Sequence, residues 1–242
     1  MTIPASASAS RNRLLATLTR QEMDLLRPAL EEVPLGLRQV LEAPGKPILY
    51  AYFMLNGLAS VIAHTRHDRQ IEVGMVGFEG MTGLAIVLGG DRSSNETLVQ
   101  APGSALRIPS DRLRQAMETG PALRGKMLRY VDAFMAQASQ TALANGRAKL
   151  EERLARWILM SHDRFAGNEL KITHEFLAVM LGVRRPGVTI GLHYLEGKGL
   201  IRSTRGLIVV LDREGLIEQA NGSYGVPEAE YERLLGQPTG AA

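Results

Sequence analysis

Residues 172–196 read ITHEFLAVMLGVRRPGVTIGLHYLE, and this stretch decides the fold of the C-terminal half of the chain. Thr173 is a good helix N-cap, because its side-chain oxygen can accept a backbone N–H from the first turn. Apolar residues then recur at helical spacing on both sides of Gly182, which supplies a turn. Two short helices joined through a glycine predict a helix-turn-helix motif.

A further helix is expected before this motif, over 149–162, and a β-hairpin after it. The second helix of the motif ends at Gly197 to Gly199, and the apolar stretches 200–201 and 207–211 flank a polar turn at 202–206. This pattern is typical of two short strands and their turn. The sequence therefore predicts a helix-turn-helix followed by a wing.

In such a motif the second helix enters the major groove of DNA with its N-terminal residues on base edges. The candidate base-reading residues are Arg184, Arg185, Gly187, Thr189 and Ile190. The candidate phosphate contacts are Thr173, His174, His193, Arg202 and Arg205. Arginine can read guanine, and helix N-termini and cations suit phosphate. The alternative is a plain helical hairpin with a solvated basic turn.

The charge along the chain supports a polyanionic partner for this region. The formal net charge is +3, but residues 145–213 hold 12 Lys+Arg against 7 Asp+Glu, while residues 214–242 hold 1 against 5. A local basic excess is what a DNA-binding segment requires.

The overall composition is that of a globular protein. The 242 residues are 45% hydrophobic and 22% charged and include no cysteine, which excludes disulfides, cysteine-ligated zinc and a cysteine nucleophile. No stretch approaches the roughly 20 apolar residues of a membrane span, and no signal peptide is evident. We expect a cytoplasmic protein with no membrane partner, whose Ala/Ser-rich start, residues 1–10, is disordered.

Residues 47–107 are rich in β-formers and turn dipeptides. The stretches 48–55 and 58–65 flank Asn56-Gly57 and predict a tight hairpin. Further apolar stretches that predict strands are 71–76, 84–88, 97–101 and 105–108. Such spacing favours an antiparallel sandwich or barrel, which a helix over 11–30 would precede and a short helix capped by Ser110 would follow.

A long helix is predicted over 122–144, ending at Asn145-Gly146, where we place the domain boundary. Its apolar face includes Met127, Tyr130, Phe134 and Thr141. This face is either an ordinary core face or the seam of a two-helix dimer.

The segment 149–211 resembles the DNA-binding domain of the Crp–Fnr family of transcription regulators, most closely in Leu-Glu-Gly-Lys-Gly-Leu-Ile at 195–201. The resemblance implies an α+β fold: an antiparallel double-stranded β-helix (β-roll) sensor at 11–120, a dimerisation helix at 121–145 and a winged helix-turn-helix domain at 146–220. An acidic tail, 221–242, would follow. It also implies a homodimer on a palindromic DNA operator, with RNA polymerase as a further partner.

By position in the family pattern, Arg185 corresponds to a base-reading arginine, and Thr173, His174 and His193 to phosphate contacts. Pro186 stands where many members have a base-contacting glutamate, and Ile190 where many have a second arginine. The operator sequence therefore does not follow from the family.

The resemblance is weaker in the sensor. Members that bind cyclic nucleotides carry Gly-Glu-Leu and a later Arg-Ser or Arg-Thr, whereas here Met81 replaces the glutamate and Arg92-Ser93 is retained. The candidate ligand pocket is Gly80, Met81, Thr82, Gly83, Arg92 and Ser93. Alternatively the glycines only form a tight turn and Arg92 is solvated. We expect no response to cyclic AMP in the family's usual way, and the effector stays unidentified.

Other site chemistry is not evident. His64 and His67 lack a third ligand nearby and fit a solvated hairpin tip, so no metal and no cofactor are expected. No P-loop, G-x-S-x-G or H-E-x-x-H motif indicates an enzyme. The chain is thus expected to be a DNA-binding regulator controlled by a signal at the β-roll. The alternative is a constitutive DNA-binding protein whose β-domain is a dimer scaffold or protein-docking surface.

Overall fold

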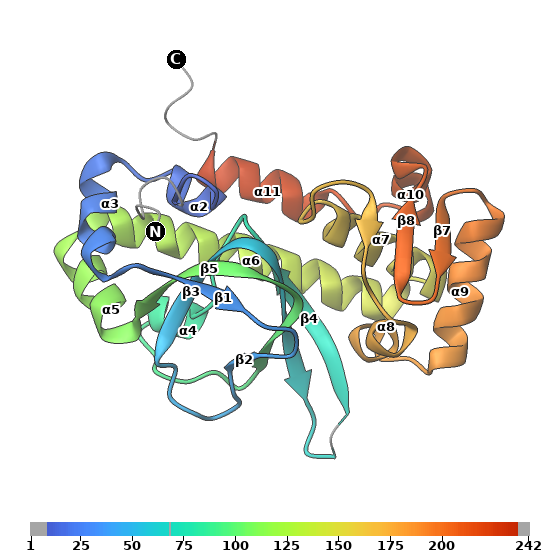
Figure 1. Ribbon diagram of the computed structural model, residues 1–242, viewed down its shortest axis with the longest axis horizontal. Helices are drawn as coiled ribbons and strands as arrows, with labels where there is room; N and C mark the ends of the chain where they lie inside the picture. The colour runs from blue at the N-terminus through green and yellow to red at the C-terminus, as the bar shows by residue number, and fades with distance from the viewer. Residues whose placement is uncertain (1–8, 68, 237–242) are drawn as a thin grey trace. The chain divides into compact units, whose positions relative to one another are not determined.

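The computed structural model describes residues 9–67 and 69–236 (Figure 1). The chain divides into two compact units. The first unit comprises residues 1–61, 75–135 and 229–242, and the second comprises 62–74 and 136–228. Most of the Ala/Ser-rich start, expected to be disordered, lies outside the described residues. No helix in the described ranges is long and apolar enough to cross a membrane.

A five-stranded sheet forms the centre of the N-terminal part. Its strands are β1 (Glu31–Leu35), β2 (Val40–Glu42), β3 (Tyr50–His64), β4 (Gln70–Val76) and β5 (Glu96–Pro109). The strand order is β1-β5-β3-β4, with β2 also on β5, and β1 and β2 run antiparallel to β5. An antiparallel N-terminal sheet in a mixed α and β chain confirms the predicted fold class.

The hairpin predicted at Asn56-Gly57 is wrong, because β3 runs through both residues as one strand. Gly57 has a φ of +79°, and a Cβ there would lie 2.7 Å from the Ala101 carbonyl oxygen on β5. The Asn56 side chain accepts the Ser104 N–H at 2.8 Å. The glycine therefore serves a close approach to β5 inside the sheet. The stretches 97–101 and 105–108 likewise belong to one strand.

Helices replace other expected elements. The apolar stretch 84–88, expected as a strand, forms α4 (Leu84–Val87), since a short apolar stretch alone cannot distinguish a strand from a buried helix. The helix expected over 11–30 is broken into α2 (Arg13–Ala16), α3 (Arg20–Leu26) and the 3₁₀ turn η1 (Arg27–Ala29). Thr19 starts α3 through a capping box with Glu22.

The core of the first unit lies between the sheet and these helices. It includes Leu14, Leu26, Phe53, Met81, Leu106, Leu113, Leu123 and Met127. α5 (Ser110–Thr119) follows β5. Ser110 does not cap it; its hydroxyl instead donates to the Ile48 carbonyl at 2.6 Å.

The long helix α6 (Pro121–Arg147) does not end at Asn145-Gly146 as predicted. Both residues are helical, and the Ala148 N–H still bonds to the Ala144 carbonyl at 2.9 Å. A single Asn-Gly pair costs a helix only about 1 kcal/mol or slightly more, which continued backbone bonding offsets.

The second unit contains the predicted DNA-binding elements. They are α7 (Leu150–His162), β6 (Glu169–Leu170), α8 (His174–Leu181), α9 (Arg185–Gly197), β7 (Ile201–Thr204), β8 (Leu207–Val210) and α10 (Arg213–Gln219). The antiparallel strands lie in the order β6-β8-β7. The helix before the motif, the helix-turn-helix and the wing are thus confirmed.

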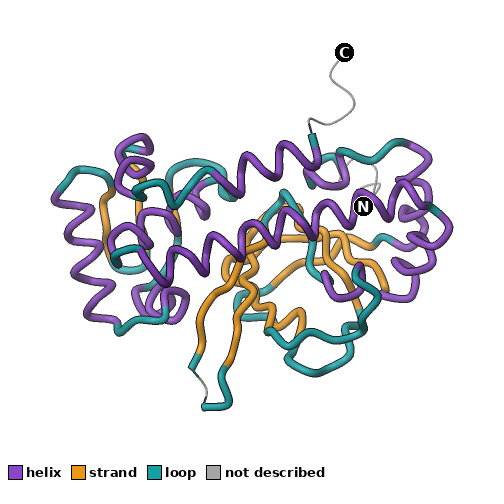
Figure 2. Tube along the Cα trace, turned by 180° about the vertical axis from the view of Figure 1, so that it is seen from behind, coloured by secondary structure: helices purple, strands orange, loops and turns teal. Residues whose placement is uncertain are grey.

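The C-terminal segment is not a loose tail. Residues after 221, expected as an acidic appendage, include a ten-residue helix, α11 (Val226–Leu235), which is one of the purple helices in Figure 2. Tyr231 and Leu235 of this helix pack against the core of the first unit. The excess of acidic residues in this segment gave no sign of this packing, because it depends on two apolar side chains.

Candidate DNA interface

The turn between α8 and α9 has the geometry that the sequence predicts. The Thr173 hydroxyl accepts the Phe176 N–H at 3.2 Å and caps α8. Gly182 ends α8 with a φ of +62°, a conformation that glycine adopts without strain. A Cβ there would come within 3.0 Å of Ile71.

Apolar contacts fix which face of α9 points outward. Val188, Leu192 and Leu195 are completely buried, and α9 packs against α7 and α8. Gly187 and Gly191 face α7, where a Cβ on either would lie 3.2 Å from a leucine side chain. The inner face is therefore occupied along the whole helix.

The outer face presents three of the candidate base-reading residues. Arg184 and Arg185 are exposed at the start of α9, and Ile190 is 71% exposed. Gly187 is half-buried against α7. The Thr189 hydroxyl lies 3.1 Å from His174 Nδ1 and bonds the Arg185 carbonyl at 3.3 Å, so it joins α9 to α8.

Arg185 has a partner that sequence reasoning missed. Its Nη1 lies 2.8 Å from Glu175 Oε1, and both side chains are more than 60% exposed. An exposed ion pair of this kind contributes only about 0 to 1 kcal/mol, so a stronger contact can replace it. The signal in the sequence was the acidic residue in the first turn of α8.

Most of the candidate phosphate contacts are also exposed. His193, Arg202 and Arg205 are exposed, and Thr173 is exposed at the start of α8. His174 is half-buried by its contact with Thr189. Across residues 171–205 there are six Lys+Arg against two Asp+Glu. A cationic surface of this kind suits a polyanion.

In the first unit, the candidate ligand residues do not form one open pocket. Gly80 to Gly83 are buried, and Met81 is 0% exposed within the core. The Met81 carbonyl accepts the Tyr130 hydroxyl at 3.1 Å. Ser93 is half-buried, and the Arg92 side chain is 57% exposed and pairs with Asp91.

The buried carboxylate of Glu42, which the sequence did not indicate as a site residue, accepts a hydrogen bond from the turn at residues 80–83. Glu42 Oε1 accepts the Gly83 N–H at 2.6 Å, at the start of α4. Burial raises the pKa of the Glu42 carboxyl above its ordinary value, and hydrogen bonds from Gly83, Thr82 and Thr97 partly offset this rise. The Thr82 N–H bonds the Tyr52 carbonyl, so the N–H groups of both Thr82 and Gly83 are used within the chain.

The apolar face predicted on α6 is a core face. Met127 and Tyr130 belong to the core of the first unit, Phe134 is buried, and the Thr141 hydroxyl bonds the Gln137 carbonyl at 2.9 Å. Met127, Tyr130 and Phe134 are therefore covered by this chain itself, while a role of the half-buried Thr141 in a dimer stays a prediction. Leu128, Met135 and Leu143 are exposed on another face of the helix.

His64 and His67 differ in exposure. His64 is half-buried and His67 exposed. Among the described residues, no group of three or more His, Cys, Asp or Glu side chains could hold a metal ion.

Comparison with known families decides what this winged domain is. Residues 152–219 match the family described as the Crp-like helix-turn-helix domain. The winged domain is therefore of the Crp-like helix-turn-helix type. The matched residues include α8, α9 and the wing, where the candidate DNA contacts lie.

Solved structures show that the fold extends beyond this domain. FixK2 from Bradyrhizobium japonicum matches with a TM-score of 0.69 and 18% identity, covering 78% of this chain and 96% of that one. A Crp/Fnr-family regulator from Thermus thermophilus matches with a TM-score of 0.64 and 24% identity, covering 80% and 100%.

A c-di-GMP-responsive global regulator from Xanthomonas campestris matches with a TM-score of 0.65 and 17% identity, covering 79% and 99%. At these identities the likeness shows a shared fold. No curated protein sequence matches the chain.

Proposed function

We propose that this chain is a transcription regulator of the Crp/Fnr type that binds a palindromic DNA operator as a homodimer, with α9 of each subunit in a major groove. The observation that carries the proposal is the exposed start of α9. Arg185 and Ile190 present a bidentate donor and an apolar group, the two kinds of contact that distinguish guanine and thymine. The exposed Arg202 and Arg205 of the wing supply phosphate contacts beside them.

The proposed dimer forms through the outer face of α6. Leu128 and Met135 are seven residues apart and Leu143 follows eight residues later, so the three share one side of the helix. Their exposed fractions are 38%, 59% and 55%. Apolar side chains repeated at this spacing suit packing against a second copy of the helix.

Selection from a random duplex library tests this function. The intact protein, immobilised and washed at increasing salt, is expected to enrich two inverted half-sites with centres about one helical turn, or roughly 34 Å, apart. Sequencing after successive rounds measures the enrichment. Recovery of duplexes without any common sequence would overturn the proposal.

We infer further that cyclic AMP does not control this protein in the family's usual way. Met81 has no group that can accept a ribose hydroxyl, and an unmet buried hydroxyl costs about 1 to 3 kcal/mol. Glu79, the nearest carboxylate in sequence, already accepts the Gly77 N–H at 3.1 Å. Calorimetric titration is expected to detect no micromolar binding. Micromolar binding that Glu79→Gln abolishes would contradict this inference.

A second candidate function is constitutive DNA binding, with the β-domain as a scaffold or docking surface. The Glu42 contact favours it, because the Gly83 N–H that would attract an anion is already satisfied within the chain. Operator affinity measured with and without a small-molecule extract of cells separates the two candidates. A change in affinity excludes the constitutive one.

A further inference from the structure

A small cavity lies inside the second unit, where it is lined by residues of β4, α6, α7 and α8. All of its lining residues belong to that unit. The cavity has a volume of about 20 Å³, which is room for about one water-sized particle. It is therefore too small for a metabolite and can hold only a water molecule or a single small ion.

Two arginines of α7, Arg153 and Arg156, line this cavity with buried donors that lack an acceptor. Arg156 is only 5% exposed, and its Nη2 is buried without a hydrogen-bond partner among the described residues. Nε of Arg153 is buried without a partner in the same way. Because a guanidinium group only donates hydrogen bonds, and a buried charged donor without an acceptor is costly, both arginines require an acceptor.

Other N–H groups of the same two side chains hold them in place. The Arg156 Nε hydrogen is donated to the Ser223 carbonyl at 2.8 Å, and Arg153 Nη2 donates to the Leu181 carbonyl at the end of α8. Burial lowers the pKa of both Arg153 and Arg156, because their charged forms are removed from water. The two guanidinium groups are thus fixed at a place where their charge is poorly solvated.

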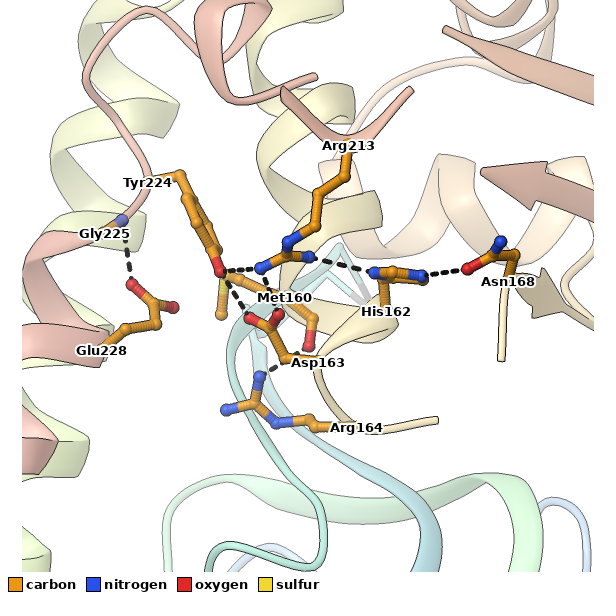
Figure 3. Close-up of polar contacts among 9 residues, drawn as sticks. All are labelled: Met160, His162, Asp163, Arg164, Asn168, Arg213, Tyr224, Gly225 and Glu228. Atoms are coloured by element: carbon orange, nitrogen blue, oxygen red, sulfur yellow. Dashed lines mark hydrogen bonds and ion pairs between the residues drawn. The ribbon is translucent and has the colours of Figure 1, made fainter. Parts of the chain in front are cut away.

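Two other arginines of this unit, the buried Arg164 and the half-buried Arg213, bond acceptors that the chain itself supplies (Figure 3). Arg164 Nη1 donates to the Met160 carbonyl at 2.6 Å. Arg213 Nη2 bonds Asp163 Oδ1 at 2.7 Å and the Tyr224 hydroxyl at 2.6 Å. The buried donors without a partner are therefore a particular feature of the cavity, and they indicate an acceptor that is not part of the chain.

The charge of the lining determines which kind of acceptor fits. Glu72 of β4 also lines the cavity, and its Oε1 accepts the Trp157 Nε1 hydrogen at 2.8 Å. Two guanidinium groups against one carboxylate give the lining a net charge of +1. A water molecule would satisfy the donors and leave this buried charge, whereas a monovalent anion would satisfy the donors and also balance the charge.

From these observations we propose that the cavity binds one monatomic, monovalent anion of the chloride class, which accepts hydrogen bonds from Arg153 and Arg156. Phosphate, sulfate and organic carboxylates are too large for a volume of about 20 Å³. The ion strengthens the packing of α7 on α8, because Arg153 also bonds the Leu181 carbonyl. This site is independent of the DNA-binding function proposed above, and its test requires no DNA.

The fluorescence of Trp157 tests the site in the full chain. Trp157 is the only tryptophan of the sequence, lines the cavity and is 3% exposed, so anions in bulk water do not reach it. Bromide quenches tryptophan on contact and resembles chloride in charge and size. At constant ionic strength kept with sodium gluconate, bromide is expected to cause a loss of fluorescence that saturates at millimolar concentration and that chloride reverses. Absence of quenching, or quenching that neither saturates nor responds to chloride, would overturn the proposal.

Arg156→Gln removes one of the two charges, and Arg147→Gln, which changes an exposed arginine of α6 in the same unit, is the matched control. Arg156→Gln is expected to raise the bromide concentration at half-saturation at least about tenfold, while the control keeps the wild-type value. A wild-type curve for Arg156→Gln would contradict the assignment. If this variant fails to fold, urea unfolding of the wild type in chloride and in gluconate of equal ionic strength replaces it. The midpoint should be higher in chloride, since the ion binds only the folded state, and equal midpoints would overturn the site.

Discussion

The Arg185 guanidinium at the start of α9 pairs with Glu175 and must leave this partner to reach a base. Because the pair is exposed, a bidentate contact to guanine is the stronger interaction. Arg185→Ala is expected to cost about 1 to 3 kcal/mol on the selected operator and to relax specificity at one base pair. Fluorescence anisotropy with operator variants measures both effects.

Arg205→Ala in the wing is the control for that experiment. Loss of a phosphate contact should weaken binding to all sequences alike and reduce the salt slope by about 1. If Arg185→Ala weakened operator and random DNA equally, Arg185 would be a phosphate contact and not a base reader.

The buried carboxyl of Glu42 is expected to make the stability of the folded chain depend on pH. Burial raises the pKa of this carboxyl in the folded chain above the ordinary value of 4.5. Between these two values the folded state binds more protons than the unfolded state, so the contribution of Glu42 to stability falls as the pH rises. Glu42→Gln removes this ionisation.

The free energy of unfolding can be measured by urea titrations between about pH 4 and pH 7. As the pH rises, the stability of Glu42→Gln should therefore increase relative to that of the wild type. Glu118→Gln, which changes an exposed carboxylate on α5, serves as the control. A difference between Glu42→Gln and wild type that is independent of pH would show that Glu42 ionises alike in both states.

At the scale of elements, the sequence predicts best where local signals agree with packing. In the second unit the Thr173 cap, the Gly182 turn and the apolar periodicity all indicate the same helices, and the structure has them. Local signals fail where tertiary contact decides. Asn56-Gly57 reads as a hairpin, yet the approach of β5 keeps β3 continuous.

The candidate sites follow the same division. The exposure of Arg185 and Ile190 was predictable, because the helical period separates the buried and exposed faces of α9. The contact of Glu42 with Gly83 was not, because it joins residues 41 positions apart. Periodicity also identified an apolar face on α6 but could not say whether this chain or a second copy covers it.

The outer face of α6 is the dimer interface that we propose. Met135→Asp places a charge on the face that we assign to the dimer, while the core residues Met127 and Tyr130 stay in place. Since burying an unpaired carboxylate is costly, the variant is expected to sediment as a monomer and to lose tight operator binding. Arg129→Ala, also exposed but about a third of a turn away around the helix, should remain dimeric. A dimeric Met135→Asp protein would place the interface elsewhere.

At the scale of the whole molecule, one chain has one α9, whereas the palindromic operator that we propose has two half-sites. Along the chain, α6 leads from the β-domain to the winged domain. A signal can alter operator binding only if it stabilises the two conformational states unequally. In the dimer that we propose, the interface between the subunits would determine how far apart the two copies of α9 lie.

A hydroxyl-radical footprint on the selected duplex, combined with the mass of the complex in solution, tests whether the protein binds DNA as a dimer with one α9 in each of two major grooves. We predict two chains per duplex and two protected segments on one face of the DNA, about one helical turn apart. A complex of one chain per duplex, or protection that does not depend on the DNA sequence, would contradict the proposed binding of a dimer to two half-sites.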